Sequence, residues 1–269
     1  MVNTPTLAKR TLGAKLRRLR ETAGIHVNDA AAHAGVDRTT VQRWEHGRTA
    51  PKAGIIRSLG GLYQADNAEI SRMTALAARS AERGIWEGAK VPPQLRALYE
   101  AEGPASLVRS VELDYIPGLL QTSEYLTAAQ AARVPLTREA AEAVRLAYHQ
   151  RQKVMFSGGQ RPRLQFVFGQ SALTYLDGLP EVKVGQVARL EEVSALPGVE
   201  IRVISGLHAA MDGAFTIIEP HVDGLGEPFV SLDSADGLRY VEDPDVVSYY
   251  QRAFARVFEF ATPLEEYLK

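Results

Sequence analysis

The segment from Val27 to His46 constrains the fold of this chain more than any other stretch. An alanine-rich run is followed by Gly35 and then by Asp37, which is a good N-cap for a second helix from Arg38 to His46. Gly35 can adopt the left-handed conformation at low cost, as a tight turn between helices requires. Two short helices joined in this way predict a helix-turn-helix.

The side chains of this segment also explain how the two helices would pack. A small residue in the first helix lets the second approach closely, and three apolar residues point inward to close the core between them. The predicted core of the motif comprises Ala31, Gly35, Val36, Val41 and Trp44.

Three more helices are expected around the motif. The first has apolar residues at the spacing of one helical face and ends at Gly24. Pro51 is well placed to start the fourth helix, and residues 66–83 are predicted to form the fifth. The sequence therefore predicts an all-α, five-helix domain over residues 1–90.

Charge is unevenly distributed along the chain. Residues 1–58 contain eleven Lys and Arg against four Asp and Glu, a net charge of +7, whereas the whole chain carries −1. The remainder is therefore acidic, with a net charge of −8. A basic N-terminal segment followed by an acidic remainder indicates that the N-terminal segment binds a polyanion. The alternative is that the charge difference arises by chance and that the basic residues form a solvated helix face.

In a helix-turn-helix the second helix enters the major groove of DNA, where its side chains meet the base edges. Arg suits the edge of guanine and Gln that of adenine, whereas contacts to phosphates position the protein without specifying sequence. The residues expected to read bases are Arg38, Thr39, Gln42, Arg43 and His46. The residues expected to contact phosphates are Lys15, Arg17, Arg18, Thr40, Arg48 and Lys52. For any single Arg, a solvated helix face is the alternative.

The run Gly47-Arg48-Thr49-Ala50-Pro51, preceded by Val41–His46, resembles the lambda-repressor-like, or xenobiotic-response-element, class of DNA-binding domains. The resemblance implies that Glu45 is structural and pairs with a nearby Arg. The class usually has a polar cap and a Gln at the start of the first motif helix, where this chain has His26 and a valine. His26 or Asn28 is then the candidate to replace the phosphate contact of that Gln.

The string Pro117-Gly118-Leu119-Leu120-Gln121-Thr122 resembles a hallmark of a second family. This family is the large C-terminal domain of actinobacterial, antitoxin-like helix-turn-helix regulators. Arg145–Lys153 resembles its Arg-rich helix and Leu164–Ala172 its next strand, although Gln170-Ser171 replaces the family's usual Glu. The resemblance implies a small partner protein encoded by a neighbouring gene.

Local patterns predict a mixed α/β domain over residues 91–269, and hence an α+β chain overall. Helices are expected at residues 94–109, 138–155, 181–195 and 245–260, and strands at residues 164–168, 199–204, 214–219 and 228–232. The last helix carries an aromatic stripe that includes Tyr249 and Phe254. Such a stripe is usually core, and the alternative is a dimer surface.

The sequence contains no recognised catalytic motif and no cysteine, so no enzyme activity, cofactor or metal is expected. His208 with Asp212, and His221 with Asp223, form a weak alternative as a metal or acid–base site. No apolar run approaches the length of a transmembrane helix, and the N-terminus lacks a secretory signal, so a cytoplasmic location is expected.

These observations favour a sequence-specific, DNA-binding transcriptional regulator of the repressor type. A homodimer on a palindromic operator in double-stranded DNA is expected, because one recognition helix reads only a few base pairs. The C-terminal domain would then serve dimerisation and the binding of a partner or effector. The alternatives are an antitoxin-like protein whose main role is to bind a small partner protein, and a small-molecule sensor.

Overall fold

The computed structural model of the protein describes residues 7–80, 91, 93–157, 161–220, 227–234 and 237–269, and these fall into two compact units. The first unit contains the N-terminal helices and the second contains the sheet. Arg96–Ala101, part of α6 (Pro93–Glu102), groups with the first unit. The predicted boundary at residue 90 lies outside the described residues and stays a prediction.

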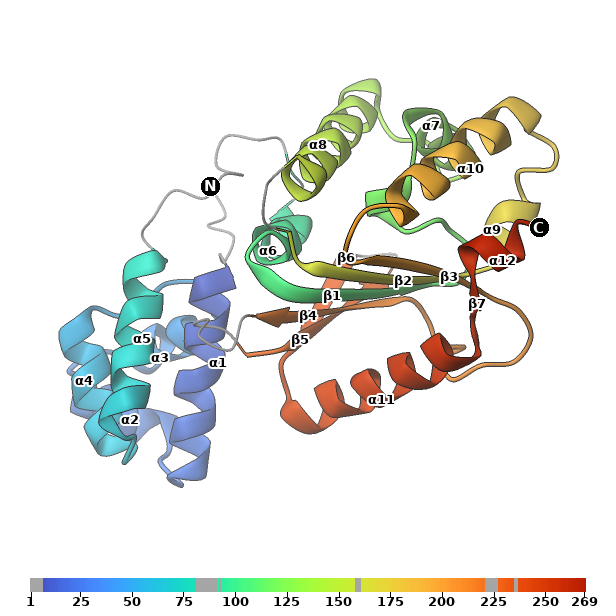
Figure 1. Ribbon diagram of the computed structural model, residues 1–269. Coiled ribbons are helices and arrows are strands. Elements are labelled where there is room, and N and C mark those ends of the chain that lie inside the picture. Colours follow the sequence, from blue (N-terminus) through green and yellow to red (C-terminus); the bar gives the residue numbers. More distant parts are fainter. Residues whose placement is uncertain (1–6, 81–90, 92, 158–160, 221–226, 235–236) are drawn as a thin grey trace. The chain divides into compact units, whose positions relative to one another are not determined.

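The N-terminal unit is all-α, as predicted. Its helices are α1 (Leu7–Thr22), α2 (Val27–Ala34), α3 (Arg38–Glu45), α4 (Ala53–Leu62) and α5 (Asn67–Arg79) (Figure 1). They share one core, which includes Leu12, Leu16, Val41, Ile56 and Met73. The apolar residues of the first helix and the inward-facing residues of the motif therefore belong to a single hydrophobic core.

The turns of this unit follow the predicted chemistry. Gly24, Gly35 and Gly47 all have positive φ values, of 68°, 65° and 67°. The Asp37 carboxylate caps α3 by accepting a hydrogen bond from the backbone N–H of Thr40 at 2.7 Å. Such caps provide hydrogen-bond partners for the backbone N–H and C=O groups that have no partner within the helix at its ends.

Two predicted helix limits in this unit need adjustment. The fourth helix begins at Ala53 with Lys52 as its N-cap, so Pro51 precedes the helix and does not start it. The fifth helix ends at Arg79, short of the predicted residue 83, and residues 81–83 lie outside the described part of the chain.

The C-terminal unit is built on a seven-stranded mixed sheet of order β6-β5-β4-β1-β2-β3-β7. The strands are β1 (Ala105–Glu112), β2 (Arg163–Gly169), β3 (Val199–Ile204), β4 (Phe215–Pro220), β5 (Phe229–Ser234), β6 (Gly237–Val241) and β7 (Thr262–Pro263). The pairs β1–β2 and β2–β3 are parallel, and the other neighbours are antiparallel. The chain is therefore α+β, as predicted.

Helices cover both faces of this sheet. The helices of this unit are η1 (Gly118–Leu120), α7 (Ser123–Ala131), α8 (Arg138–Phe156), α9 (Ser171–Thr174), α10 (Pro180–Ser194), α11 (Pro244–Phe260) and α12 (Leu264–Tyr267). In Figure 1, α7, α8 and α10 lie on one face of the sheet and α11 lies on the other. None of the described helices is both long enough and apolar enough to cross a membrane.

The predicted helix at residues 94–109 is wrong in its second half. It ends at Glu102, and Ala105–Glu112 forms β1, which pairs with β4 on one side and β2 on the other. Gly103 and Pro104 between them disfavour helix, and the strand residues that follow are all buried or partly buried. The strands β6 and β7 were not predicted either.

The other predicted strands and helices of this unit are confirmed within one or two residues at each end. The aromatic stripe of α11 is mostly core, because Phe254 and Val257 pack with Val111 and Ile217 of the sheet. Tyr249 departs from this pattern, since its side chain is 49% exposed.

Candidate nucleic-acid interface

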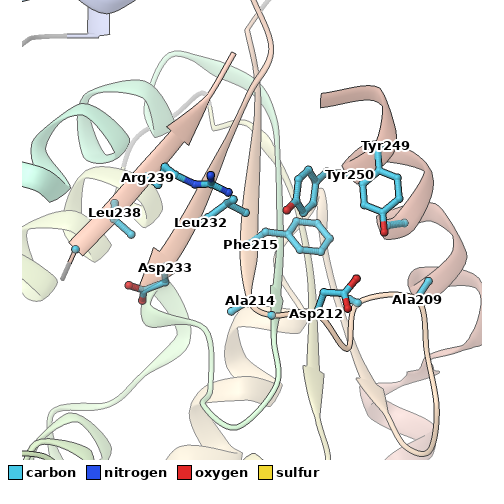
Figure 2. Close-up of a pocket in the computed structure, with 14 residues that line it drawn as sticks. Ala209, Asp212, Ala214, Phe215, Leu232, Asp233, Leu238, Arg239, Tyr249 and Tyr250 are labelled. Atoms are coloured by element: carbon cyan, nitrogen blue, oxygen red, sulfur yellow. The ribbon is translucent and has the colours of Figure 1, made fainter. Parts of the chain in front are cut away.

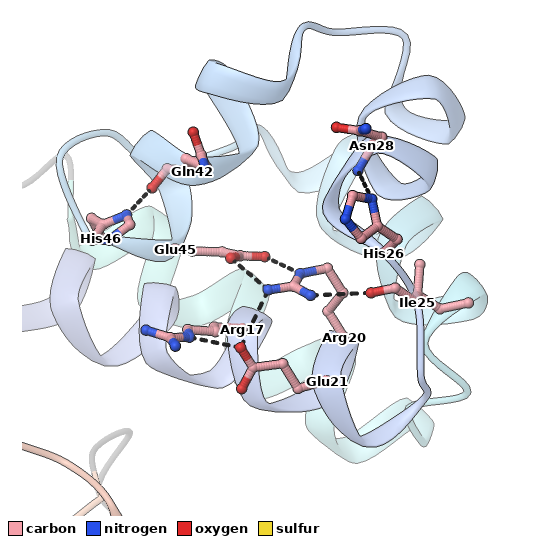
Figure 3. A network of polar contacts seen from close by, with 9 residues as sticks. All are labelled: Arg17, Arg20, Glu21, Ile25, His26, Asn28, Gln42, Glu45 and His46. Atoms are coloured by element: carbon pink, nitrogen blue, oxygen red, sulfur yellow. Dashed lines mark hydrogen bonds and ion pairs between the residues drawn. The ribbon is translucent and has the colours of Figure 1, made fainter.

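An ion pair fixes α3 against α1. The Arg20 guanidinium donates to both oxygens of the Glu45 carboxylate, Nε to Oε1 at 2.6 Å and Nη2 to Oε2 at 3.0 Å (Figure 3). The hydrogen bond to Glu45 raises the pKa of Arg20 above its ordinary value. Glu45 is therefore structural and paired with an Arg, as the resemblance implied, and it is not available to read bases.

A glycine in α1 allows the two helices to approach this closely. A Cβ atom added to Gly13 would lie 2.4 Å from the carbonyl oxygen of Trp44 and 2.7 Å from that of Glu45. Side-chain carbon atoms do not approach backbone oxygens so closely, so position 13 requires glycine. Gly13 was not among the predicted site residues, although a glycine in the interior of an otherwise good helix is a signal that could have identified it.

The solvent-facing side of α3 carries the five residues predicted to read bases. Val41 and Trp44 are buried, at 1% and 7% exposed, and hold the opposite side of the helix against the core. Arg38, Thr39, Arg43 and His46 are exposed, and Gln42 is partly exposed. The side chain of Gln42 points away from the Arg20–Glu45 pair (Figure 3). The helix therefore presents a polar, cationic surface of a kind that suits the major groove.

Two of these five side chains already have hydrogen-bond partners within the domain. The Thr39 hydroxyl donates to the Asp37 carboxylate, and this bond is the largest cause of the lowered pKa of Asp37. The His46 Nδ1 lies 2.6 Å from the backbone oxygen of Gln42. A carbonyl oxygen only accepts, so Nδ1 carries the proton and Nε2 remains for an outside partner. The side chains of Arg38, Gln42 and Arg43 form no hydrogen bond or ion pair with any residue that the structure describes.

Most of the predicted phosphate contacts lie at the surface. Arg17, Arg18, Asn28, Arg48 and Lys52 are exposed, and Thr40 is partly exposed with its hydroxyl donating to Asp37 at 3.1 Å. Arg17 forms an ion pair with Glu21 at 2.8 Å, in which both side chains are about half exposed. Such exposed pairs contribute little and exchange readily for another anion.

Asn28 is the better of the two candidates to replace the missing Gln. The ring Nδ1 of His26 accepts the backbone N–H of Asn28 at 3.3 Å, so that His26 caps α2 (Figure 3). The side chain of Asn28 itself is exposed at the start of α2.

The predicted phosphate contact of Lys15 is wrong, because this residue does not lie on the exposed surface. Its side chain is only 5% exposed, and its Nζ lies 2.9 Å from the Oε1 atom of Glu69 in α5. Position 15 follows the buried Leu12 by three residues and precedes the buried Leu16, so it lies on the core side of α1. A buried and paired ammonium group is not available to DNA.

The hallmark string of the C-terminal unit, residues 117–122, is held by two glutamines, the buried Gln186 and the partly buried Gln152. The Gln186 side chain donates to the backbone oxygen of Leu120 at 2.8 Å and accepts the backbone N–H of Thr122 at 2.9 Å. The Gln152 side chain donates to the backbone oxygen of Gln121 at 2.6 Å. These bonds tie η1 to α8 and α10, so the string performs a structural task in the fold.

The alternative metal or acid–base site does not assemble in the described residues. His221 and Asp223 lie outside them, and the His208 Nδ1 accepts the backbone N–H of Ala210 at 3.2 Å. In the part of the chain that the structure describes, no group of His, Asp and Glu side chains is arranged to hold a metal ion.

Comparison with known proteins bears on both units. Residues 95–267 match the family model described as a domain of unknown function (DUF5753), and residues 11–73 match a model described as a helix-turn-helix domain. No curated protein matches the chain. The solved structure of the clp gene regulator ClgR from C. glutamicum is 24% identical, covers 29% of this chain and 96% of its own, and has a TM-score of 0.23.

The first of these models covers more than half of the chain, and the chain therefore belongs to the DUF5753 family. Its N-terminal unit is a helix-turn-helix domain by the matched model and by the geometry of α2 and α3.

Proposed function

We propose that this protein is a sequence-specific transcriptional regulator of the repressor type, which reads an operator in the cytoplasm with α3. The observation that carries the proposal is the exposed surface of α3, where Arg38, Gln42 and Arg43 stand opposite the buried Val41 and Trp44. Arg and Gln are the side chains that pair most specifically with guanine and adenine in the major groove.

Unpaired positive charge on the same domain supports the proposal. Six exposed cationic side chains have no side-chain hydrogen bond or ion pair with another described residue: Arg18, Arg38, Arg43, Arg48, Lys52 and Arg57. Cations without internal partners are available to phosphates, and their binding releases counterions from DNA. The net charge of +7 over residues 1–58 provides the attraction over longer distances.

The proposal includes a homodimer on a palindromic operator. One α3 helix presents only three free base-reading side chains, which specify too few base pairs to select a site among many competitors. Two copies related by a two-fold axis double the number of base pairs read. Their half-sites would be about 10 base pairs apart, centre to centre, or a multiple of that spacing.

Base-reading and phosphate-binding residues are expected to respond differently to substitution. Arg43→Ala or Gln42→Ala should weaken binding to the preferred duplex by about 5-fold to 150-fold and relax the preference at one position of each half-site, because a base contact contributes about 1–3 kcal/mol. Arg17→Ala should weaken binding to all duplexes alike and reduce the salt slope by about one. Fluorescence anisotropy with labelled duplexes at several salt concentrations measures both effects.

Arg163→Ala provides the matched control, because it removes an exposed Arg of the C-terminal unit. Its affinity for the duplex should equal that of the wild type. If Arg43→Ala, Gln42→Ala and Arg17→Ala all left binding unchanged at moderate salt, the assignment of α3 to the groove would be wrong.

A second candidate function is antitoxin-like binding of a small partner protein. Exposed apolar side chains on α8 and in the segment before it favour this candidate, since Val134, Leu136 and Leu146 are all more than half exposed. Co-purification of the full chain with the small protein encoded by a neighbouring gene tests it, and a failure to co-elute would contradict it.

A further inference from the structure

The C-terminal unit contains a cavity of about 620 Å³ that the DNA-binding proposal does not use. It lies between the ends of β4, β5 and β6, the helix α11, and the loop Ala209–Ala214 (Figure 2). Cavities of about 300–1,000 Å³ with apolar walls and a few polar groups are typical of small-molecule sites.

The floor of the cavity is one row of side chains across three strands. Phe215 of β4 pairs in register with Leu232 of β5, which pairs with Arg239 of β6. Residues in register project from the same face of the sheet, so an aromatic, an aliphatic and a cationic side chain lie side by side. Figure 2 shows the Arg239 side chain extending across the floor beside Leu232.

Aromatic rings of α11 form the wall. The ring of Tyr250 packs edge-on against Phe215, with centroids 4.9 Å apart, and the ring of Tyr249 packs edge-on against Tyr250 at 5.5 Å. Tyr249 is about half exposed and stands at the mouth of the cavity. Because the ring planes are inclined to one another, at 60° for Phe215 and Tyr250 and at 85° for Tyr249 and Tyr250, they form an angled aromatic wall against which a planar group can pack edge to face.

Two carboxylates line the cavity, that of Asp233 in β5 and that of Asp212 on the loop side. Asp212 is exposed, and like Arg239 it has no side-chain hydrogen bond or ion pair with another described residue. The loop that carries it is anchored, because Ala210 is buried and its backbone N–H donates to His208. Gly213, with a φ of 141°, makes the turn back into β4 at a conformation that other residues rarely adopt.

We propose that this cavity binds a small zwitterionic molecule with a planar apolar body. The anionic group of the ligand pairs with the Arg239 guanidinium, its cationic group pairs with the Asp212 carboxylate, and its planar body packs against the rings of Tyr249 and Tyr250, which the buried Phe215 supports. An aromatic amino acid has this chemistry. The site would make the C-terminal unit a ligand-binding domain, and its existence does not depend on the proposed DNA binding.

Three probes that share one ring system test the proposal by isothermal titration of the full chain. They are L-tryptophan with both charges, tryptamine with the cation alone, and indole-3-acetate with the anion alone. L-tryptophan should bind more tightly than either of the other two, with a dissociation constant below about 1 mM.

Substitutions of Arg239 and Asp212 then show which charged group of the ligand each side chain binds. Arg239→Gln should weaken L-tryptophan and indole-3-acetate by about tenfold or more and leave tryptamine unchanged, because a charge-assisted hydrogen bond is lost. Asp212→Asn should weaken L-tryptophan and tryptamine and leave indole-3-acetate unchanged. Arg252→Gln, on the exposed side of α11 and outside this cavity, is the control and should bind all three probes as the wild type does.

The proposal is overturned if no probe shows saturable binding below about 1 mM. It is also overturned if Arg239→Gln and Asp212→Asn each leave the order of the three affinities unchanged, while circular dichroism shows both variants folded. Operator binding by the same protein samples, measured separately, distinguishes this failure from a failure of the DNA-binding proposal.

Discussion

Replacing Gly13 by alanine is expected to lower the free energy of unfolding of the helix-turn-helix unit by about 2–3 kcal/mol. The added Cβ would meet the backbone oxygens of Trp44 and Glu45 at 2.4 and 2.7 Å, and the backbone of α3 cannot rotate away as a flexible side chain can. Relief requires α1 and α3 to separate, which also strains the Arg20–Glu45 pair. DNA affinity should fall together with stability, because the position of α3 depends on this contact.

Gly54→Ala is the matched control and should not destabilise the unit. Gly54 lies in α4, is exposed, and a Cβ added there meets no atom within 4 Å. Alanine is the better helix former, so stability should stay the same or rise by up to about 1 kcal/mol. Denaturant titrations in a Trp86→Phe background, where Trp44 is the remaining tryptophan, measure both variants. A Gly13→Ala variant as stable as the wild type would contradict the close packing of α1 on α3.

Glu112→Gln is expected to remove a pH dependence from the C-terminal unit. Desolvation at the end of β1 and, to a lesser extent, the charge of Asp233 raise the pKa of Glu112 to about 8, although the charges of Arg151 and Arg133 act in the opposite direction. The folded chain therefore keeps this carboxyl protonated at neutral pH, whereas the unfolded chain releases the proton near pH 4.5. The wild type should lose stability as the pH rises from 4.5 to about 8, by at most about 1.4 kcal/mol for each pH unit.

The wild type and Glu112→Gln should therefore differ in the pH dependence of their stability. Glutamine does not titrate, so Glu112→Gln should match the wild type near pH 5 and be the more stable protein by about 2 kcal/mol or more near pH 9. Glu142→Gln, at an exposed position of α8, should keep the wild-type dependence. Hydrogen exchange of peptides from β1 and β2, corrected for the intrinsic rate at each pH, measures the difference. Parallel curves for Glu112→Gln and the wild type would contradict the raised pKa.

The sequence predicted the helix-turn-helix unit well because its signals are local. Asp37 caps the helix that follows it, Gly35 adopts the left-handed turn, and Trp44 faces the core, and each of these depends on only a few neighbouring residues. The exposed face of α3 follows from the same periodicity, since residues on the other side of a helix from a buried stripe are necessarily outside.

The predictions that proved wrong or incomplete concern residues whose environment is set by contacts with residues distant in sequence. Lys15 belongs to the basic set of α1 by composition, but only the position of Glu69, 54 residues later, shows that its ammonium group is internal. Gly13 is unfavourable in an isolated helix, and only the close packing of α3 against α1 explains why a glycine is needed there. Residues 105–109, the first part of β1, were predicted as helix, because the strands that pair with β1 lie far away in sequence and give no local signal. The cavity beside Arg239 likewise combines residues from three strands and one helix.

The measurement that tests the central claim most directly is selection of bound duplexes from a randomised DNA library, by the full-length wild type and by Arg43→Ala in parallel. The wild type should enrich a palindrome whose half-sites are separated by about 10 base pairs or a multiple of it, and Arg43→Ala should enrich the same palindrome with one symmetric pair of positions relaxed. The absence of any enriched sequence with the wild type, or an enriched motif that Arg43→Ala selects unchanged, would contradict the assignment of α3 as the helix that reads DNA.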